Sequence, residues 1–359
     1  MAKKLACDKV LFTVILLLLT FGLVMVYSAS APLARGKAGN PLFVRQCAAA
    51  ALGLLAMTVL MHLPYRLLRE PRVIWTLLGG TLLLLVAVLF QPSLNGTRRW
   101  FFFGPLSLQA SELAKLAVLP FLAYQIDRKN EQVNQRDFLL PTLLVVGVVA
   151  ALILAEPDLG TAALLVLVAA VLIFLAGLSL RYVAGAGVVL GALLVVAVFS
   201  ADYRRARLLA FLSPESDPLG NGYQALQSLI AVGSGGLFGL GQGRSVQKLY
   251  FLPHPESDFI FSIVAEELGL LGALALLAVF GVLAWRGIRA SLAAPDRFGR
   301  YLGLAITCLL VVQALINSAV AVALLPTKGI PLPFISYGGS SLIVALTLSG
   351  VLLNISEHG

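Results

Sequence analysis

Charged residues are scarce in this chain. They make up 12% of its 359 residues, about half the share that is usual in a soluble domain. Hydrophobic residues make up 59%, and the mean hydropathy is +0.95. So little polar surface excludes a water-soluble globular protein, a disordered chain and a small disulfide-rich scaffold, and it leaves a polytopic membrane protein.

Cysteine is also rare and forms no pattern. The three cysteines are Cys7, Cys47 and Cys308, with no Cys-x-x-Cys motif and no Cys/His pair. Neither a disulfide framework nor a cysteine metal site is indicated. The net charge of +9, from 26 Lys and Arg against 17 Asp and Glu, does not indicate nucleic-acid binding, because no basic run is interleaved with aromatic residues.

Long apolar runs dominate what remains. A helix of about 20 apolar residues crosses a hydrocarbon core of about 30 Å, and such runs predict an all-α polytopic membrane protein with ten transmembrane helices. They lie near residues 10–28, 42–63, 73–91, 111–126, 138–155, 161–179, 182–200, 258–285, 301–325 and 336–355. The 201–257 segment between the seventh and eighth helices is the large loop, and residues 1–359 form a single membrane domain.

The basic residues predict the orientation of these spans. Ten spans place both termini on one side, and that side holds 14 of the 26 Lys and Arg residues, mostly in short loops, against six in the opposite short loops. The positive-inside rule therefore predicts cytoplasmic termini and an extracellular 201–257 loop. No cleavage pattern followed by a soluble domain comes after the basic N-terminus, so we expect a retained first span instead of a signal peptide.

Two groups of polar residues stand out before the middle of the chain. Arg98 and Arg99 precede Trp100 and three phenylalanines, which indicates either a phosphate-binding site or an ordinary aromatic belt with two outward arginines. Glu112 and Lys115 are spaced i, i+3 and can pair on one helix face. Such a pair is either a structural contact or a substrate-facing site. Removal of one partner is expected to lower the stability of the fold, because the other charge would be left buried without a partner.

Carboxylates mark two further places. Glu156 and Asp158 flank a proline between two spans, either as a cation or acid/base site or as a turn in which Asp158 caps the next helix. Asp258 opens a very apolar helix. It is either a simple cap or a general base whose pKa is raised by partial burial. Glu266 and Glu267, two turns deeper, need partners or a polar cavity.

The last polar region follows Gln313 and Asn317. Three prolines and three glycines between residues 326 and 339 forbid a continuous helix there. The Tyr-Gly-Gly-Ser-Ser sequence at 337–341, which includes Ser340, leads into the last span. Its small residues allow either close helix packing or close approach of the backbone to a ligand.

These motifs, taken in order, resemble the SEDS family (shape, elongation, division and sporulation), which contains the FtsW and RodA proteins. The resemblance extends over essentially the whole chain. It is carried by residues 25–30, 99–100 with 109–115, 156–161, 222–228, 233–239, 258–269 and 332–341. Residues 25–30 and 247–249 resemble division-type FtsW more than elongation-type RodA.

The resemblance implies a ten-helix peptidoglycan glycosyltransferase of the cytoplasmic membrane. It polymerises lipid II at the outer face and works with a class B penicillin-binding protein transpeptidase of the FtsI type and with other divisome proteins. The family's essential aspartate matches Asp258, its important tryptophan matches Trp100, and its Glu and Lys pair matches Glu112 and Lys115. The chain departs from the family at residues 253–258, where His254 and Glu256 are exchanged, and at Ala110, where a proline is common.

The implied reaction inverts an α-linked donor into a β-1,4 product in a single in-line displacement, with Asp258 as the base. Candidates to bind the leaving pyrophosphate are Arg98, Arg99, Arg204, Arg205, Arg207, Arg244 and Lys248. A divalent cation, Mg²⁺ or Mn²⁺, bound by Asp158 or Glu156 is a further possibility, and Ser340 and Trp100 are candidate substrate contacts. We expect a groove open to lipid near the fourth, fifth and eighth spans and the 201–257 loop.

Two competing classes of function remain open at this point. A lipid II flippase would use Glu112, Lys115, Glu266 and Glu267 as a polar path across the membrane. A scaffold without chemistry would tolerate substitution of every charge in these motifs.

Overall fold

The computed structural model describes residues 7–32, 39–92, 97–103, 106–129, 132–185, 187, 211, 217, 220, 222–327 and 329–358. Helices account for most of them. The elements are α1 (Lys9–Ser30), α2 (Pro41–His62), the 3-10 helix η2 (Tyr65–Arg69), α3 (Pro71–Val88), β1 (Trp100–Phe103), β2 (Leu106–Gln109), α4 (Ala110–Lys129), α5 (Arg136–Ala155), α6 (Leu159–Leu175), α9 (Tyr223–Ser234), α10 (Ile260–Ala293), α11 (Arg297–Ala321) and α12 (Gly339–Ser356).

The expected helical membrane fold is confirmed. Within the described ranges, seven helices are long and apolar enough to cross a membrane, namely α1, α2, α3, α5, α10, α11 and α12. The shorter α6 and the more polar α4 match the sixth and fourth expected spans. Most of the expected seventh span, 182–200, and much of the 201–257 loop lie outside the described residues.

Local signals explain where several helices begin. The Asp8 carboxylate accepts hydrogen bonds from the amides of Val10 and Leu11, both at 3.0 Å, and so caps α1. Asn40 caps α2 in the same way, with Pro41 in the first helical turn, where its missing N–H costs nothing. These caps satisfy amides that the helix itself leaves without a partner.

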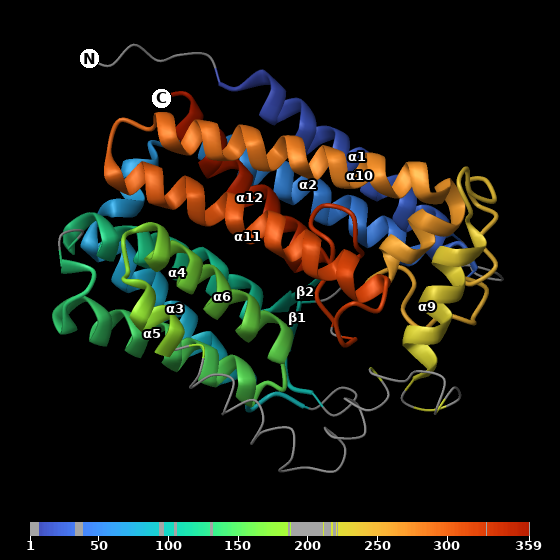
Figure 1. Ribbon diagram of the computed structural model, residues 1–359, viewed down its shortest axis with the longest axis horizontal. Coiled ribbons are helices and arrows are strands. Elements are labelled where there is room, and N and C mark those ends of the chain that lie inside the picture. Colours follow the sequence, from blue (N-terminus) through green and yellow to red (C-terminus); the bar gives the residue numbers. More distant parts are fainter. Residues whose placement is uncertain are drawn as a thin grey trace.

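The helices form a bundle in which α11 lies between two groups (Figure 1). On one side α10 packs along α11 and α1 packs along α10, and on the other side α4 and α6 contact α11. The closest pair, α2 and α12, needs a residue without a side chain: a Cβ atom at Gly350 would lie 2.5 Å from the carbonyl oxygen of Met57. Glycine thus permits the backbone contact between these two helices.

The start of α1 and the end of α12 lie at the same end of the bundle (Figure 1), which we call the terminal end. The amide of Asp8 donates to Ser356 Oγ at 3.2 Å, and Arg286 Nε donates to the Asp8 carboxylate at 2.8 Å. This arrangement agrees with an even number of spans. The opposite end, called the loop end, holds the β1–β2 hairpin, the turn between α5 and α6, and the loops that precede α10 and α12.

A small sheet departs from the purely helical expectation. Strands β1 and β2 pair antiparallel, with Trp100 opposite Gln109 and Phe103 opposite Leu106. The aromatic run at residues 100–103 therefore forms half of a hairpin that leads directly into α4.

The eighth span is also interrupted, which the apolar run alone did not indicate. Its 34 residues would extend about 51 Å as a straight helix, but Gly269 has φ 71° and ψ −171° and breaks it. The carbonyl oxygens of Glu266 and Glu267 accept hydrogen bonds from the amides of Leu240 and Gly241, both at 3.0 Å. Glu266 and Glu267 therefore lie in a short helical segment before the break, not deep within a continuous span.

Candidate active site

Asp258 lies in a loop that is fixed to the segment before α12. Its backbone oxygen accepts a hydrogen bond from Asn317 Nδ2 at 3.0 Å, and the preceding carbonyl, of Ser257, accepts one from Ser336 Oγ at 2.6 Å. Gly329 lies beside the carboxylate, where an added Cβ atom would be 3.3 Å from Asp258 Oδ2. The loop therefore has its position set by α11 and by the irregular segment that the prolines predicted.

The electrostatic surroundings of Asp258 come from two other motifs. Burial raises the pKa of the Asp258 carboxyl, whereas His254, a hydrogen bond with Ser257 and the charge of Arg99 lower it, and Asp158 raises it further; the net pKa is raised. Arg99 and Asp158 are thus close enough to Asp258 to act on its charge. The structure thus brings the expected base together with Arg99, from the Arg-Arg-Trp segment, and with Asp158, from the turn between α5 and α6.

Arg99 is held by the turn between α5 and α6. Its Nε donates to the carbonyl oxygen of Glu156 at 2.9 Å, and Nη2 donates to that of Pro157. Both acceptors are neutral carbonyl groups, and a guanidinium has five N–H donors. Arg99 therefore keeps its positive charge and further donors for an anion. Arg98, in contrast, is exposed and donates to the carbonyl oxygen of Leu89 at 2.9 Å.

Asp158 caps α6, as one of the two interpretations predicts. Its Oδ1 accepts from the Thr161 amide at 3.1 Å, and its Oδ2 accepts from Gln109 Nε2 at 2.9 Å and from Ser111 Oγ at 3.1 Å. Both carboxylate oxygens are thus occupied by protein donors. The cap also connects α6 to β2 and α4.

Glu156 differs sharply from its neighbour two residues away. Its side chain is fully buried, and neither carboxylate oxygen has a hydrogen-bond partner. Burial, and next the charge of Asp158, raise the pKa of Glu156 to about 8. Within the described part of the chain, no group of three or more His, Cys, Asp or Glu side chains is arranged to hold a metal ion.

Ser340 is connected to Trp100 indirectly, through the second strand of the hairpin. Ser340 Oγ donates to the carbonyl oxygen of Ser107 at 2.8 Å and accepts from the Gln109 amide at 3.0 Å. Because Gln109 pairs with Trp100 across the two strands, the start of α12 supports the strand that carries Trp100. Ser340 is itself buried, so it supports this edge of the site instead of facing open solvent.

The expected pair of Glu112 and Lys115 is confirmed. Lys115 Nζ lies 2.7 Å from Glu112 Oε1 and 3.1 Å from Gln313 Oε1. Gln313 Nε2 in turn donates to the carbonyl oxygen of Pro331 at 2.8 Å. The pair therefore connects α4 to α11 and to the segment that holds Asp258.

Other candidates lie elsewhere. Lys248 belongs to a second buried cluster, in which its Nζ is 2.6 Å from Glu267 Oε1, and this contact argues against an ammonium that is free to bind pyrophosphate. Arg244 is exposed in the same loop. The other three arginines proposed for the clamp, at positions 204, 205 and 207, lie outside the described residues.

One supporting residue was missed at the sequence level. Gln46 on α2 donates to the carbonyl oxygen of Ser336 at 3.0 Å and accepts from the amide of Gly338 at 3.1 Å. Its amide thus fixes the segment that in turn holds Asp258. The signal was present, since an amide side chain within an apolar span requires a partner.

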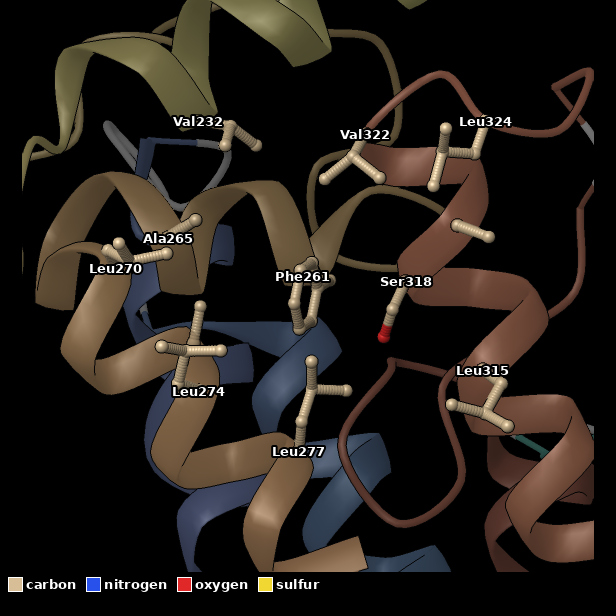
Figure 2. A pocket seen from close by; sticks show the side chains of 12 residues that line it. Val232, Phe261, Ala265, Leu270, Leu274, Leu277, Leu315, Ser318, Val322 and Leu324 are labelled. Atoms are coloured by element: carbon tan, nitrogen blue, oxygen red, sulfur yellow. The ribbon is translucent and has the colours of Figure 1, made fainter.

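An apolar cavity of about 350 Å³ lies between α9, α10 and α11 (Figure 2). Phe261, Leu274 and Leu315 line it, and Phe261 is three residues after Asp258 in the chain. This cavity shares the eighth span, α10, and part of the 201–257 loop, α9, with the groove expected from the sequence, but α11 stands in place of the expected fourth and fifth spans.

The fold and site define a polytopic helical membrane protein whose polar motifs converge on a partly buried aspartate at one end of the bundle. The model of the FtsW, RodA and SpoVE family of cell cycle proteins matches residues 8–359. The chain belongs to this family, and the resemblance seen in the sequence is confirmed.

Individual relatives cover almost the whole chain. A probable peptidoglycan glycosyltransferase FtsW of Geobacter metallireducens is 44% identical over 98% of this chain and 95% of that protein. Stage V sporulation protein E of Bacillus subtilis is 42% identical, over 99% of this chain and 98% of the relative. A solved structure described as "Structural coordination of polymerization and crosslinking by a peptidoglycan synthase complex" contains a similar chain, with a TM-score of 0.84, 33% identity and 98% coverage of both chains.

Proposed function

We propose that this protein is a peptidoglycan glycosyltransferase of the FtsW type, which polymerises lipid II into glycan strands during cell division. The observation that carries the proposal is the placement of Asp258 in the field of Arg99 and Asp158 at the loop end. The names of two relatives, both called probable peptidoglycan glycosyltransferase FtsW, support the activity and the FtsW type over the RodA type. Asp258 acts on the acceptor sugar, and Arg99 acts on the pyrophosphate of the donor.

The proposed chemistry is a single displacement with inversion. The C4 hydroxyl oxygen of the acceptor attacks C1 of the donor, and the bond from C1 to the pyrophosphate oxygen breaks with its electron pair on that oxygen. The hydroxyl proton passes to the Asp258 carboxylate. A raised pKa strengthens Asp258 as a base, since a general base works best with a pKa near the operating pH.

Positive charge is the second requirement, because the leaving pyrophosphate gains charge as the bond breaks. Arg99 keeps N–H donors beyond the two that hold the turn between α5 and α6. Arg98 and Arg244 are exposed, but Arg98 donates to the carbonyl oxygen of Leu89 and Arg244 lies in the loop of Lys248. Arg99 is therefore the described arginine that we assign to this group. Guanidinium groups suit this task because they bind phosphate oxygens in pairs.

The described carboxylates do not fit a cation held by the protein. Asp158 uses both oxygens for protein donors, and burial holds the Glu156 carboxyl with a pKa of about 8. Mg²⁺ in proteins is usually bound through one or two ionised carboxylates, together with waters or substrate phosphates. We therefore derive no step of the reaction through Mg²⁺ or Mn²⁺.

The proposed location is the cytoplasmic (inner) membrane, with the terminal end in the cytoplasm and the loop end outside. Arg66, Arg69 and Arg286 at the terminal end support this orientation through the positive-inside rule. The proposed partner is a class B penicillin-binding protein of the FtsI type, alongside other divisome proteins. The similar chain within a synthase complex that coordinates polymerization and crosslinking supports such a partner.

The test is glycan polymerisation by the purified full-length chain with lipid II in detergent, with and without the cognate transpeptidase. We expect Asp258→Asn to lower the rate roughly 10²- to 10⁴-fold, the usual contribution of a general base. Asp137→Asn, an exposed residue at the terminal end, is the matched control and should keep the wild-type rate. Polymerisation at the wild-type rate by Asp258→Asn would refute the base assignment.

The flippase alternative is tested in the same preparation. Its polar path is divided in the structure, since Glu112 and Lys115 bind each other while Glu267 binds Lys248. Transbilayer movement of lipid II in vesicles, together with no polymer in detergent, would favour the flippase over the glycosyltransferase.

A further inference from the structure

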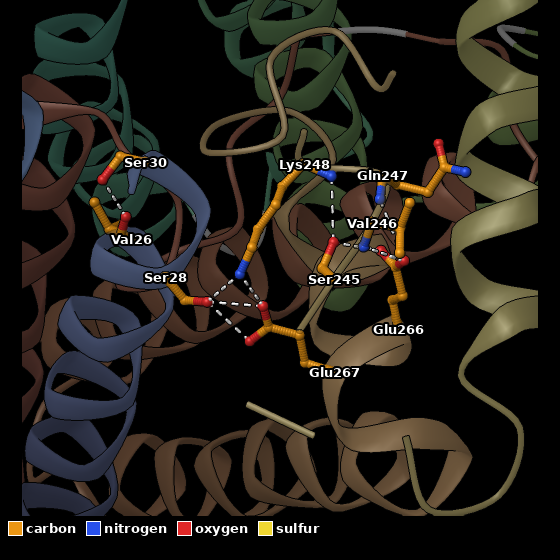
Figure 3. A network of polar contacts seen from close by, with 9 residues as sticks. All are labelled: Val26, Ser28, Ser30, Ser245, Val246, Gln247, Lys248, Glu266 and Glu267. Atoms are coloured by element: carbon orange, nitrogen blue, oxygen red, sulfur yellow. Dashed lines mark hydrogen bonds and ion pairs between the residues drawn. The ribbon is translucent and has the colours of Figure 1, made fainter. Parts of the chain in front are cut away.

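A second buried cluster lies beside the loop that carries Asp258 (Figure 3). Lys248 Nζ is 2.6 Å from Glu267 Oε1 and 2.9 Å from Ser28 Oγ. Ser28 Oγ is also 2.7 Å and 2.9 Å from the two Glu267 oxygens. The cluster thus joins three elements, α1, the loop before α10, and α10 itself, with side chains that are almost fully buried.

The adjacent carboxylate fixes the same short turn. Glu266 accepts hydrogen bonds from Ser245 Oγ and from the amides of Val246 and Gln247, at 2.5, 2.8 and 3.3 Å. Two consecutive glutamates therefore bind residues 245–248. Buried carboxylates are costly unless they are paired and hydrogen-bonded, so both have a strong preference for this one arrangement.

Because α10 is broken at Gly269, this cluster helps to set the direction of the helical segment that precedes the break. The amides of Leu270 and Leu271 donate to the carbonyl oxygens of Gly236 and Leu237, not to the preceding turn of α10. The segment before the break, residues 260–268, therefore does not take its direction from the rest of α10 through helical hydrogen bonds. Its direction depends on the contacts of its own residues, namely the loop amides that donate to the carbonyl oxygens of Glu266 and Glu267 and the partners of their side chains.

Asp258 directly precedes this segment. We infer that Lys248, Glu267 and Ser28 are positioning residues, which hold the first two turns of α10 against α1 and thereby place the Asp258 carboxylate for reaction. Asn317 and Ser336 hold the backbone of residues 257–258 on one side, and the Lys248 cluster holds the helix that follows on the other. This inference rests on the proposed function, in which Asp258 is the base.

The positioning role predicts a specific kinetic signature. A reacting group displaced by about 1 Å loses roughly 10²-fold in rate, so we expect Lys248→Met and Glu267→Gln each to lower kcat by roughly 10- to 100-fold. The KM for lipid II should change by less than about twofold, because neither residue touches substrate. A pyrophosphate ligand would instead raise KM.

The two residues should also act as one unit. The double variant Lys248→Met with Glu267→Gln should lose little more activity than either single variant, since both remove the same contact. Lys248→Arg, which retains the charge, should recover part of the kcat that Lys248→Met loses. Multiplied losses in the double variant, or a higher KM with wild-type kcat, would overturn the inference.

A milder variant and a distant control complete the test. Ser28→Ala removes a hydroxyl and no charge, and the loss of its hydrogen bonds to Glu267 and from Lys248 should lower kcat about threefold to tenfold in protein that stays folded by size exclusion. Wild-type kcat in folded Ser28→Ala would contradict the inference even if the charge variants do not fold. Lys129→Met, at the terminal end, is the matched lysine control with wild-type kinetics expected.

The same assay separates the two proposals. No polymer from the wild type would show that the proposed function is wrong, whereas an Asp258→Asn variant with the wild-type rate would overturn the base assignment and with it the positioning role. An inactive Asp258→Asn variant together with a fully active Lys248→Met variant would show that only the positioning role is wrong.

Discussion

The two ends of the bundle use charge in opposite ways. At the terminal end two of the three ion pairs among the described residues have a solvent-exposed arginine: the side chain of Arg66 in its pair with Asp296 is 55% exposed, and that of Arg69 in its pair with Asp127 is 52% exposed. The side chain of Arg286 in its pair with Asp8 is 21% exposed. At the loop end, the pairs of Glu112 with Lys115 and of Glu267 with Lys248 have no side chain more than 4% exposed.

This difference separates two roles of charge in a membrane protein. Exposed pairs contribute about 0–1 kcal/mol each, so the terminal end gains orientation and helix caps from its charges more than stability. Buried charges must have partners, and the loss of one partner costs about 3–5 kcal/mol. Substitution of one buried charge at the loop end is therefore expected to destabilise the protein strongly, because these charges lie within apolar helices.

The largest expected effect on stability is at the buried pair of α4. Lys115→Met should lower the free energy of unfolding by about 3–5 kcal/mol, because it leaves the Glu112 carboxylate buried without its partner. The measurement is equilibrium unfolding of the full chain in mixed detergent. The double variant Lys115→Met with Glu112→Gln removes both charges and should recover a substantial part of the loss.

A Lys115→Met protein as stable as the wild type would remove the contrast between the two ends. The matched control is Lys129→Met, because Lys129 is also on α4 but donates only to the backbone oxygen of Asp137 at the terminal end. Its unfolding free energy should change by well under 1 kcal/mol, as for most exposed substitutions.

The next largest effect is expected at Glu156, where substitution should raise the free energy of unfolding instead of lowering it. Its pKa is about 8 in the folded chain against a reference value of 4.5, so folding favours its protonated form. The stability this gives is complete below about pH 4.5 and is lost as the pH rises to about 8. At pH 7 the penalty is on the order of 3 kcal/mol. Glu156→Gln removes it and should stabilise the protein.

The pH profile distinguishes this cause from a general effect of the substitution. The gain in unfolding free energy from Glu156→Gln should be small near pH 4.5 and should grow up to about pH 8. Measurement of unfolding at pH 5, 6, 7 and 8 gives the profile. A gain that does not vary with pH would mean that Glu156 is charged, or is exposed to water, in the folded chain.

Much of this contrast could be predicted from the sequence, because a polar residue within an apolar span needs a hydrogen-bond or charge partner. The spacing of Glu112 and Lys115 predicted their ion pair, and the Glu-Pro-Asp motif correctly offered capping by Asp158. Nine expected spans match described helices for the same reason, since length and hydropathy determine which segments cross a membrane.

Contacts between distant segments could not be read in this way. Nothing local to Lys248 indicates Ser28 as its partner, 220 residues away, and so Lys248 was assigned to the pyrophosphate instead. The apolar run at 258–285 likewise concealed the break at Gly269, because the loop amides that stabilise the break lie about 30 residues earlier in the chain. Such features depend on tertiary packing, which periodicity does not encode.

The smallest effect expected is at the terminal end, and it tests the other half of the comparison. Arg66→Ala should change the unfolding free energy by less than about 1 kcal/mol, since its pair with Asp296 is exposed. Asp296→Ala should cost about 1–2 kcal/mol, because Asp296 also caps α11 through the Gly299 amide at 2.8 Å and accepts from Tyr65 Oη at 2.6 Å. If Arg66→Ala cost as much as Lys115→Met, burial would not be what separates the two ends.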